Sequence, residues 1–280
     1  MDNSNSVWRR FLRHKPAMIG SIVFALIVLS AIFAPLLTPY SPYELSQSFE
    51  AAPSSEHILG TDLVSRDVFT RLLYGSRVSL LVGVGTVIVY VIIGGILGTL
   101  AGYFGGWVDS LIMRFTDIIM SFPFFIVILV MVSILGPAMS NIIFALGVLG
   151  WPPIARIIRG SILTIKNQDY IKAGRVLGYS DLRLIFKHIL PNIMAPILVN
   201  ATFGVSNAII AESSLSFLGM GVQPPRSSWG NILTDAQSMT ILAHEPWLWV
   251  PAGLMIVITV LSVNFIGDGL RDALDPKKIQ

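Results

Sequence analysis

The sequence contains no cysteine, and only 12% of its 280 residues are charged, against 54% that are hydrophobic. Without cysteine there are no disulfides and no thiol chemistry, so the sequence carries no redox clue to its compartment. So few charges and so much apolar surface in a chain of this length are typical of a protein that crosses a membrane several times. The net charge of +3 is less informative than the distribution of the charges along the chain.

The sequence also has no G-x-x-x-x-G-K-[ST] loop, and no lysine follows a glycine. Such loops cradle phosphates with backbone amides and a lysine, so we expect no ATP site on this chain. His14, His57, His188 and His244 are scattered and have no carboxylate cluster beside them, which argues against a metal site. No nucleophile–base pair is visible, so we expect no catalytic residue and no cofactor on this chain.

Six apolar windows approach the roughly 20 residues that a helix needs to cross a bilayer: 17–37, 79–104, 117–135, 141–158, 193–211 and 248–266. The fourth window is interrupted by Trp151-Pro152-Pro153, so we expect it to kink and to continue into water as an amphipathic helix over 154–165. The first window is longer than the apolar region of a signal peptide, which predicts a retained membrane anchor.

Lysine and arginine predict the orientation, because they are enriched in cytoplasmic segments. With the N-terminus inside, only four of the 19 fall outside: Arg66, Arg71, Arg77 and Arg226. We therefore expect an all-α, multi-pass protein of the inner or plasma membrane with six spans and both ends in the cytoplasm. Its expected parts are a cytoplasmic segment 1–16, a six-span domain 17–270 with outer loops 40–77 and 212–247 and an inner loop 159–191, and a cytoplasmic tail 271–280.

The middles of the six windows contain no ionisable side chain, and Asp117, Glu212 and Asp268 lie at window ends. Ion-coupled carriers usually need ionisable groups at depth, so a secondary carrier that works alone is the less favoured reading. Four polar residues inside the windows either bond between helices or line a translocation path: Asn200, Ser206, Asn207 and Asn264.

Gly94, Gly98 and Gly102 repeat every fourth residue in the second window. Small residues at this spacing let helix backbones approach closely. Ordinary bundle packing is the first interpretation, and a face that slides during gating is the second.

The stretch KAGRVLGYSDLRLIFKHILP, residues 172–191, is charged although apolar sequence surrounds it. We predict a helix over 169–177, a left-handed turn at Gly178 and a second helix capped by Ser180. Leu182, Ile185, Phe186 and Ile189 would share one face of that helix. A position between two spans argues against nucleic-acid binding. A lipid-surface helix and a docking element for a cytoplasmic partner both remain open.

This stretch resembles the cytoplasmic coupling motif of ABC importer permeases, Glu-Ala-Ala-x3-Gly-x9-Ile-x-Leu-Pro. Three positions depart from the motif, because Lys172, Gly174 and His188 replace Glu, the second Ala and Ile. The resemblance implies that the following residues couple to an ATPase: Lys172, Ala173, Gly174, Gly178, Asp181, Leu182, Ile185, Phe186, His188, Leu190 and Pro191.

Three other stretches are similar to the peptide/nickel branch of that family: HILGTDLVSRDVFTRLLYGSR at 57–77, SLSFLGMGVQPPRSSWG at 214–230 and GDGLRDALDP at 267–276. In the first, we expect a turn followed by a helix that Asp67 opens, with Val68, Leu72 and Leu73 on one face. Docking of a binding protein is expected at Gly60, Asp62, Arg66, Asp67, Arg226 and Trp229.

The resemblance implies a half-permease that works with a second homologous permease, two ATPase subunits that hold ATP and Mg, and an extracytoplasmic substrate-binding protein. Membrane lipid is the remaining partner. The resemblance favours a di- or oligopeptide substrate, and import of nickel or a metal chelate is the alternative. A different kind of function is also open, namely a membrane scaffold that recruits a soluble protein through its inner loop.

Overall fold

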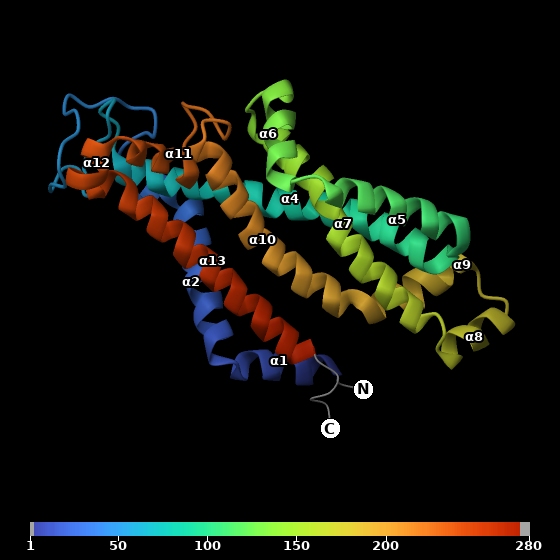
Figure 1. Cartoon of the computed structure of the whole chain (residues 1–280). Coiled ribbons are helices and arrows are strands. Elements are labelled where there is room, and N and C mark those ends of the chain that lie inside the picture. The colour runs from blue at the N-terminus through green and yellow to red at the C-terminus, as the bar shows by residue number, and fades with distance from the viewer. Residues whose placement is uncertain (1–2, 275–280) are drawn as a thin grey trace.

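The computed structural model describes residues 3–274, which fold almost entirely into helices (Figure 1). Within these residues, the only extended pairing is an isolated bridge between Thr61 and Asp67. The helices are α1 (Asn3–Arg13), α2 (Lys15–Ile32), α3 (Ala34–Leu37), α4 (Val68–Phe104), α5 (Gly106–Ser121), α6 (Phe124–Leu135), α7 (Met139–Ile165), α8 (Asp169–Val176), α9 (Asp181–Arg183), the π-helix η1 (Leu184–Ile189), the 3-10 helix η2 (Leu190–Ile193), α10 (Met194–Phe217), α11 (Trp229–Leu233), the 3-10 helix η3 (Thr234–Gln237), α12 (Met239–His244) and α13 (Pro246–Leu274).

The helices agree with the predicted all-α membrane fold. Five of them are long and apolar enough to cross a membrane, and there are six crossings if α5 and α6 are counted as one. The five are α2, α4, α7, α13 and the continuous helical segment Asp181–Phe217, which contains α9 and α10.

The third apolar window, 117–135, is not the straight span that we expected. The chain bends by 87° between α5 and α6. Proline disfavours helical backbone at the residue before it and has no amide hydrogen to donate. Phe122 is accordingly extended, and Pro123 is the N-cap of α6. The number of apolar residues in the window does not reveal this bend, which depends on the single Pro123.

The fourth window does not break at its proline pair, because α7 is a single helix from Met139 to Ile165 with Pro152 and Pro153 inside it. The predicted helical extension to Ile165 is therefore present. Ile154, Ile158 and Ile162 on this extension are fully buried in the core that α7 shares with α4. Packing on that side holds the helix together where two backbone donors are missing.

Close packing of α4 against α7 explains the glycine repeat. A Cβ on Gly98 would lie 2.6 Å from the Ala155 carbonyl oxygen, and one on Gly94 would lie 2.8 Å from the Trp151 carbonyl oxygen. A Cβ on Gly102 would meet Ile162 at 2.9 Å. The packing interpretation is therefore confirmed, and the sliding interpretation stays a prediction.

Replacing Gly98 with valine should destabilise the bundle, because the new side chain would overlap the α7 backbone, which cannot move aside as a flexible side chain would. Overpacking of this kind costs about 1–3 kcal/mol. The matched control is Gly95→Val on the same helix, where a Cβ meets nothing within 4 Å. Thermal unfolding of both purified variants in detergent measures the difference. Equal melting temperatures would contradict the packing argument.

The loops and short helices lie at two ends of the bundle (Figure 1). Residues 38–67 lie with α11 and α12 at one end, which we call the loop end. The helices α1 and α8 lie at the other, which we call the basic end. At 37 residues, α4 is about 55 Å long and therefore longer than the roughly 30 Å core of a bilayer. It consequently takes part in sites at both ends.

Candidate functional site

The first candidate site is the helical hairpin at the basic end, residues 169–193. Gly178 adopts a φ of 79°, and its amide donates to the Arg175 carbonyl, so the left-handed turn is present as predicted. The Ser180 hydroxyl accepts a hydrogen bond from the Arg183 amide at 3.4 Å, which confirms the predicted cap. The chain then runs without interruption from Asp181 into the α10 span. A displacement of the hairpin is thus transmitted directly to a membrane-crossing helix.

The predicted apolar face of the second helix is wrong. Ile185 and Ile189 are buried in the core between α4 and α7, whereas Leu182 and Phe186 are 68% and 66% exposed. The cause is the π-helical turn η1, whose wider i→i+5 pattern breaks the α-helical alignment of these four residues. Ile185 and Ile189 therefore fix the hairpin to the core, whereas Leu182 and Phe186 are free to contact a partner or lipid. Two more exposed apolar residues, Val176 and Leu177, end the first helix.

Contacts with α4 hold the base of the hairpin. The Tyr103 hydroxyl donates to the Asp181 carboxylate, and the Arg175 guanidinium lies 5.4 Å from the centre of the Tyr103 ring. Gly174, which stands where the family motif has alanine, is buried, and a Cβ there would lie 3.1 Å from the Tyr179 ring. The tyrosine thus occupies part of the space beside the glycine.

The other motif departures lie at the hairpin surface or edge. Lys172 pairs with Asp169 at 3.7 Å, and both side chains are exposed. The half-buried His188 ring stacks on Tyr179 at 5.7 Å. Ala173 and Pro191 are exposed, and Leu190 is half-buried. Coupling through any of these residues stays a prediction.

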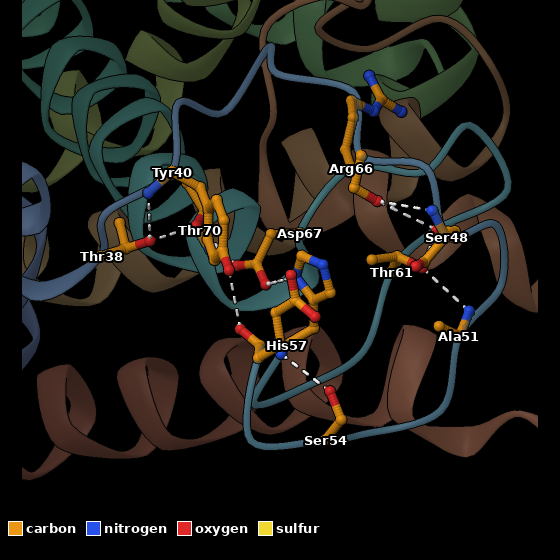
Figure 2. Close-up of polar contacts among 12 residues, drawn as sticks. Thr38, Tyr40, Ser48, Ala51, Ser54, His57, Thr61, Arg66, Asp67 and Thr70 are labelled. Carbon is orange, nitrogen blue, oxygen red and sulfur yellow. Dashed lines mark hydrogen bonds and ion pairs between the residues drawn. The ribbon is translucent and has the colours of Figure 1, made fainter.

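The second candidate site is the ordered loop before α4 at the loop end (Figure 2). Asp67 caps α4 as predicted, since its Oδ1 accepts from the Thr70 amide and hydroxyl at 2.7 Å each. Its Oδ2 lies 3.0 Å from the His57 Nδ1, and the Thr70 hydroxyl meets that of Thr38. Val68, Leu72 and Leu73 are buried, which agrees with their predicted common face. The helix that Asp67 opens is α4 itself, so the predicted short helix and the predicted second span, 79–104, are one continuous helix.

A buried ion pair connects this loop to the segment between α10 and α13. Asp62 is almost completely buried, and its Oδ2 accepts from Arg71 and from the Arg66 Nε, the latter at 2.8 Å. Arg71 also donates to the Ser227 hydroxyl at 3.2 Å and to the Asn231 side chain at 3.0 Å. The arginine therefore joins residues that are more than 150 positions apart in the chain.

Asp235 lies beside the same arginine, with its Oδ2 4.0 Å from an Arg71 nitrogen. Burial raises the pKa of Asp235 to about 6, and the positive charge of Arg71 opposes that shift. Asp62, which accepts a hydrogen bond from Arg71, is therefore the closer acidic partner of the arginine.

Most of the residues predicted to dock a binding protein lie inside this end of the molecule. Asp62, Asp67 and Trp229 are buried, and the Trp229 indole donates to the Leu72 carbonyl at 3.3 Å and to the Ser76 hydroxyl at 3.2 Å. Gly60 has a φ of 72°, and a Cβ there would lie 2.2 Å from the Ala51 carbonyl oxygen. Arg66 is half-buried and Arg226 is exposed, so only these two are accessible to a partner in this conformation.

Glu212 lies in the last two turns of α10, and it is fully buried. Its Oε1 accepts from the Ser216 hydroxyl at 2.7 Å and from the Ser228 hydroxyl at 2.8 Å. Ser228 is also the N-cap of α11. The Glu212 side chain therefore attaches the segment between α10 and α13 to α10.

The third candidate site is a cavity of about 690 Å³ between α4, the bent pair α5–α6, α7 and α10. Asn200 and Asn207, predicted for a translocation path, line it together with Thr86, Tyr90 and several phenylalanines. Ser206 is instead buried, where its hydroxyl donates to the Val260 carbonyl on α13 at 3.4 Å. Asn264 lies on α13, which contributes nothing to the described lining. That lining contains no ionisable side chain other than the Tyr90 phenol.

Comparison with known proteins gives two family matches. Residues 94–280 match the family described as "Binding-protein-dependent transport system inner membrane component". Residues 4–54 match the "N-terminal TM domain of oligopeptide transport permease C".

Relatives resemble the chain over nearly its whole length. The dipeptide transport system permease protein DppC of Alkalihalophilus pseudofirmus is 42% identical over 277 residues, which cover 97% of this chain and 90% of the relative. The oligopeptide transport system permease protein OppC of Bacillus subtilis is 42% identical over 281 residues, which cover 98% of this chain and 91% of the relative.

A solved structure with a similar fold is that of the MetNI methionine ABC transporter in inward-facing conformations. The matching chain has a TM-score of 0.60 and 22% identity, over 73% of this chain and 96% of that chain. At this identity the similarity concerns the arrangement of the helices.

Proposed function

Because the chain belongs to the family of binding-protein-dependent transport system inner membrane components, we propose that it is the permease subunit through which an ATP-driven importer moves dipeptides or oligopeptides across the inner membrane. The observation that carries the proposal is the single helical segment Asp181–Phe217. Its first residues form the exposed hairpin at the basic end, and its later residues, Asn200 and Asn207 among them, line the uncharged cavity.

In this proposal the chain contributes half of the path, and a second homologous permease closes the cavity. Exposed apolar residues along the bent α5–α6 pair support this arrangement, since Phe115, Phe122 and Phe124 are 45–58% exposed. ATP and Mg would bind to two partner ATPase subunits that receive the hairpin at the cytoplasmic end. An extracytoplasmic binding protein would deliver substrate at the loop end.

The cavity chemistry supports a peptide rather than a free metal ion as the substrate. Its lining offers amide, hydroxyl and aromatic groups, which can contact a peptide main chain and varied side chains. It contains no histidine, cysteine, aspartate or glutamate, which nickel and zinc sites commonly use. Import of a nickel chelate remains the second candidate, because a chelate presents organic groups to the path.

Purification of the chain from its native membrane tests the proposal. Two ATPase subunits and a second permease should accompany it, and the complex in vesicles should take up a labelled dipeptide only with ATP and the binding protein. Uptake of nickel chelate but not dipeptide would favour the alternative. Uptake by the chain alone, driven by an ion gradient, would contradict the whole proposal.

The orientation is tested separately by single cysteines in a chain that has none. Ser48 in the first outer loop and Ser180 in the hairpin are both exposed. A membrane-impermeant thiol reagent added to intact cells should label Ser48→Cys and spare Ser180→Cys. Permeabilised cells are the control, in which both should react. Labelling of only Ser180→Cys in intact cells would reverse the topology.

A further inference from the structure

Helix α1 presents three sectors of different chemistry around its axis, because successive residues are about 100° apart. Val7 and Phe11 pack against the rest of the chain. Next to them, Trp8 and Leu12 are 63% and 43% exposed and lie one turn apart. The exposed Arg9 and Arg13 follow on the third sector, and no described ion pair involves either of them. The helix is thus apolar over one arc and basic over the next.

The orientation of α1 is fixed by its packing. Phe11 is buried against Ala17 of α2 and Ala273 of α13. At Gly269 a Cβ would lie 2.3 Å from the Ala17 Cβ and 3.1 Å from the Phe11 ring, so the three helices meet tightly. The His14 Nδ1 accepts from the Ala17 amide at 3.2 Å and caps α2. As a result, α1 lies across the ends of α2 and α13 rather than along them (Figure 1).

The exposed sectors continue the surface that a membrane covers. On α2, apolar exposure resumes at Ile19, Ile22 and Leu26, within a helix that has the length and hydropathy of a span. A helix lying across the end of such spans is at the height of the lipid headgroups. Tryptophan favours that height, and basic residues there are attracted to anionic lipid.

We propose that α1 docks in the plane of the membrane surface, with Trp8 and Leu12 in the upper acyl region and with Arg9 and Arg13 on anionic phospholipid headgroups. Amphipathic helices with a basic polar face and tryptophan or leucine on the other face bind lipid in this way. This lipid contact is separate from transport, since none of these four residues lines the cavity or belongs to the hairpin.

Spin labels at single cysteines test the depth of α1 in the full-length chain reconstituted into vesicles of phosphatidylcholine and phosphatidylglycerol. Labels at Trp8→Cys and Leu12→Cys should collide with dissolved oxygen more often than with a water-soluble nickel complex. Labels at Arg9→Cys and Arg13→Cys should show the opposite preference. If the collision rate with the nickel complex were equal at all four positions, α1 would be surrounded by water, and the proposal would be overturned.

Two other occupants of the surface give distinct results. Dipolar broadening at Leu12→Cys that disappears on dilution with unlabelled chain would show that a second copy covers the patch. Oxygen preference that appears only when ATPase subunits are added would show that a protein partner covers it. Either result would overturn the lipid assignment.

The headgroup contact is tested by the number of phosphatidylglycerol molecules that remain on the detergent-purified chain, counted by native mass spectrometry. Each arginine near an anionic surface contributes roughly a fivefold preference, so Arg13→Gln should lower the apparent affinity about fivefold. Arg226→Gln, an exposed arginine at the loop end, is the matched control and should change nothing. The headgroup contact would be contradicted if Arg13→Gln and Arg226→Gln retained the same number of phosphatidylglycerol molecules. It would also be contradicted if the unchanged chain retained phosphatidylcholine as well as phosphatidylglycerol.

Discussion

Replacing both Leu182 and Phe186 with aspartate should release the ATPase subunits from the purified complex. Both side chains are exposed on the hairpin, and burial of each in a groove of the partner would contribute about 1.5–3 kcal/mol. Loss of both therefore corresponds to a roughly 10²- to 10⁴-fold weaker association. Pull-down of the ATPase subunits, with dipeptide uptake in vesicles, measures the effect.

The matched control is Lys187→Asp, which introduces the same residue next to Phe186 at another exposed position. A surface charge pair is worth about 0–1 kcal/mol, so the complex should survive this change. Ile185→Asp is not an equivalent test, because Ile185 is buried in the core and its loss would destabilise the chain itself. Full complex and full uptake in the double variant would show that the hairpin lies against lipid.

The second large effect is expected at the loop end, where Arg71→Met should loosen the loop before α4 and the segment between α10 and α13 together. The substitution keeps most of the side-chain volume but leaves the buried Asp62 without its main partner. Breaking such a pair costs about 3–5 kcal/mol, and the remaining Arg66 contact places this case near the lower limit. The variant should melt at a lower temperature, and proteases should cut both of these segments sooner.

Arg66→Met provides the control, because Arg66 pairs with the same carboxylate from a more exposed position. Its loss should lower the melting temperature less than Arg71→Met does, because Asp62 then keeps the buried Arg71 as its partner. Adding Asp62→Asn to Arg71→Met should restore part of the stability, since no unpaired charge then remains buried. A double variant that melts below Arg71→Met would contradict the account of this ion pair.

Features that depend on a few neighbouring residues could be predicted from the sequence. The Asp67 cap, the left-handed Gly178 and the Ser180 cap each follow from one side chain and the next turn of backbone. The spans also follow from local composition, because a bilayer requires long apolar helices whatever surrounds them. For the same reason, Asn200 and Asn207 could be singled out as polar residues within a span.

Features that depend on distant contacts could not be predicted in this way. The π-helical turn separates Phe186 from Ile185 because the core between α4 and α7 takes up Ile185 and Ile189, which no periodicity reveals. Trp229 was expected at a docking surface, but it is buried and bonds to Ser76, 153 residues earlier in the chain. One sequence signal did point to Arg71. It is a charged residue in the first turn of a helix that has an apolar face, which indicates a buried partner.

The length of α4 has a consequence for communication between the two faces of the membrane. One end of this helix carries Asp67 and Arg71, and the other carries Tyr103, which holds the hairpin through Asp181. For a rigid rod of about 55 Å, a rotation of one degree about its midpoint displaces each end by about 0.5 Å in opposite directions. Such a rod acts as a lever. A tilt imposed at one membrane face therefore moves the opposite face without any intervening joint.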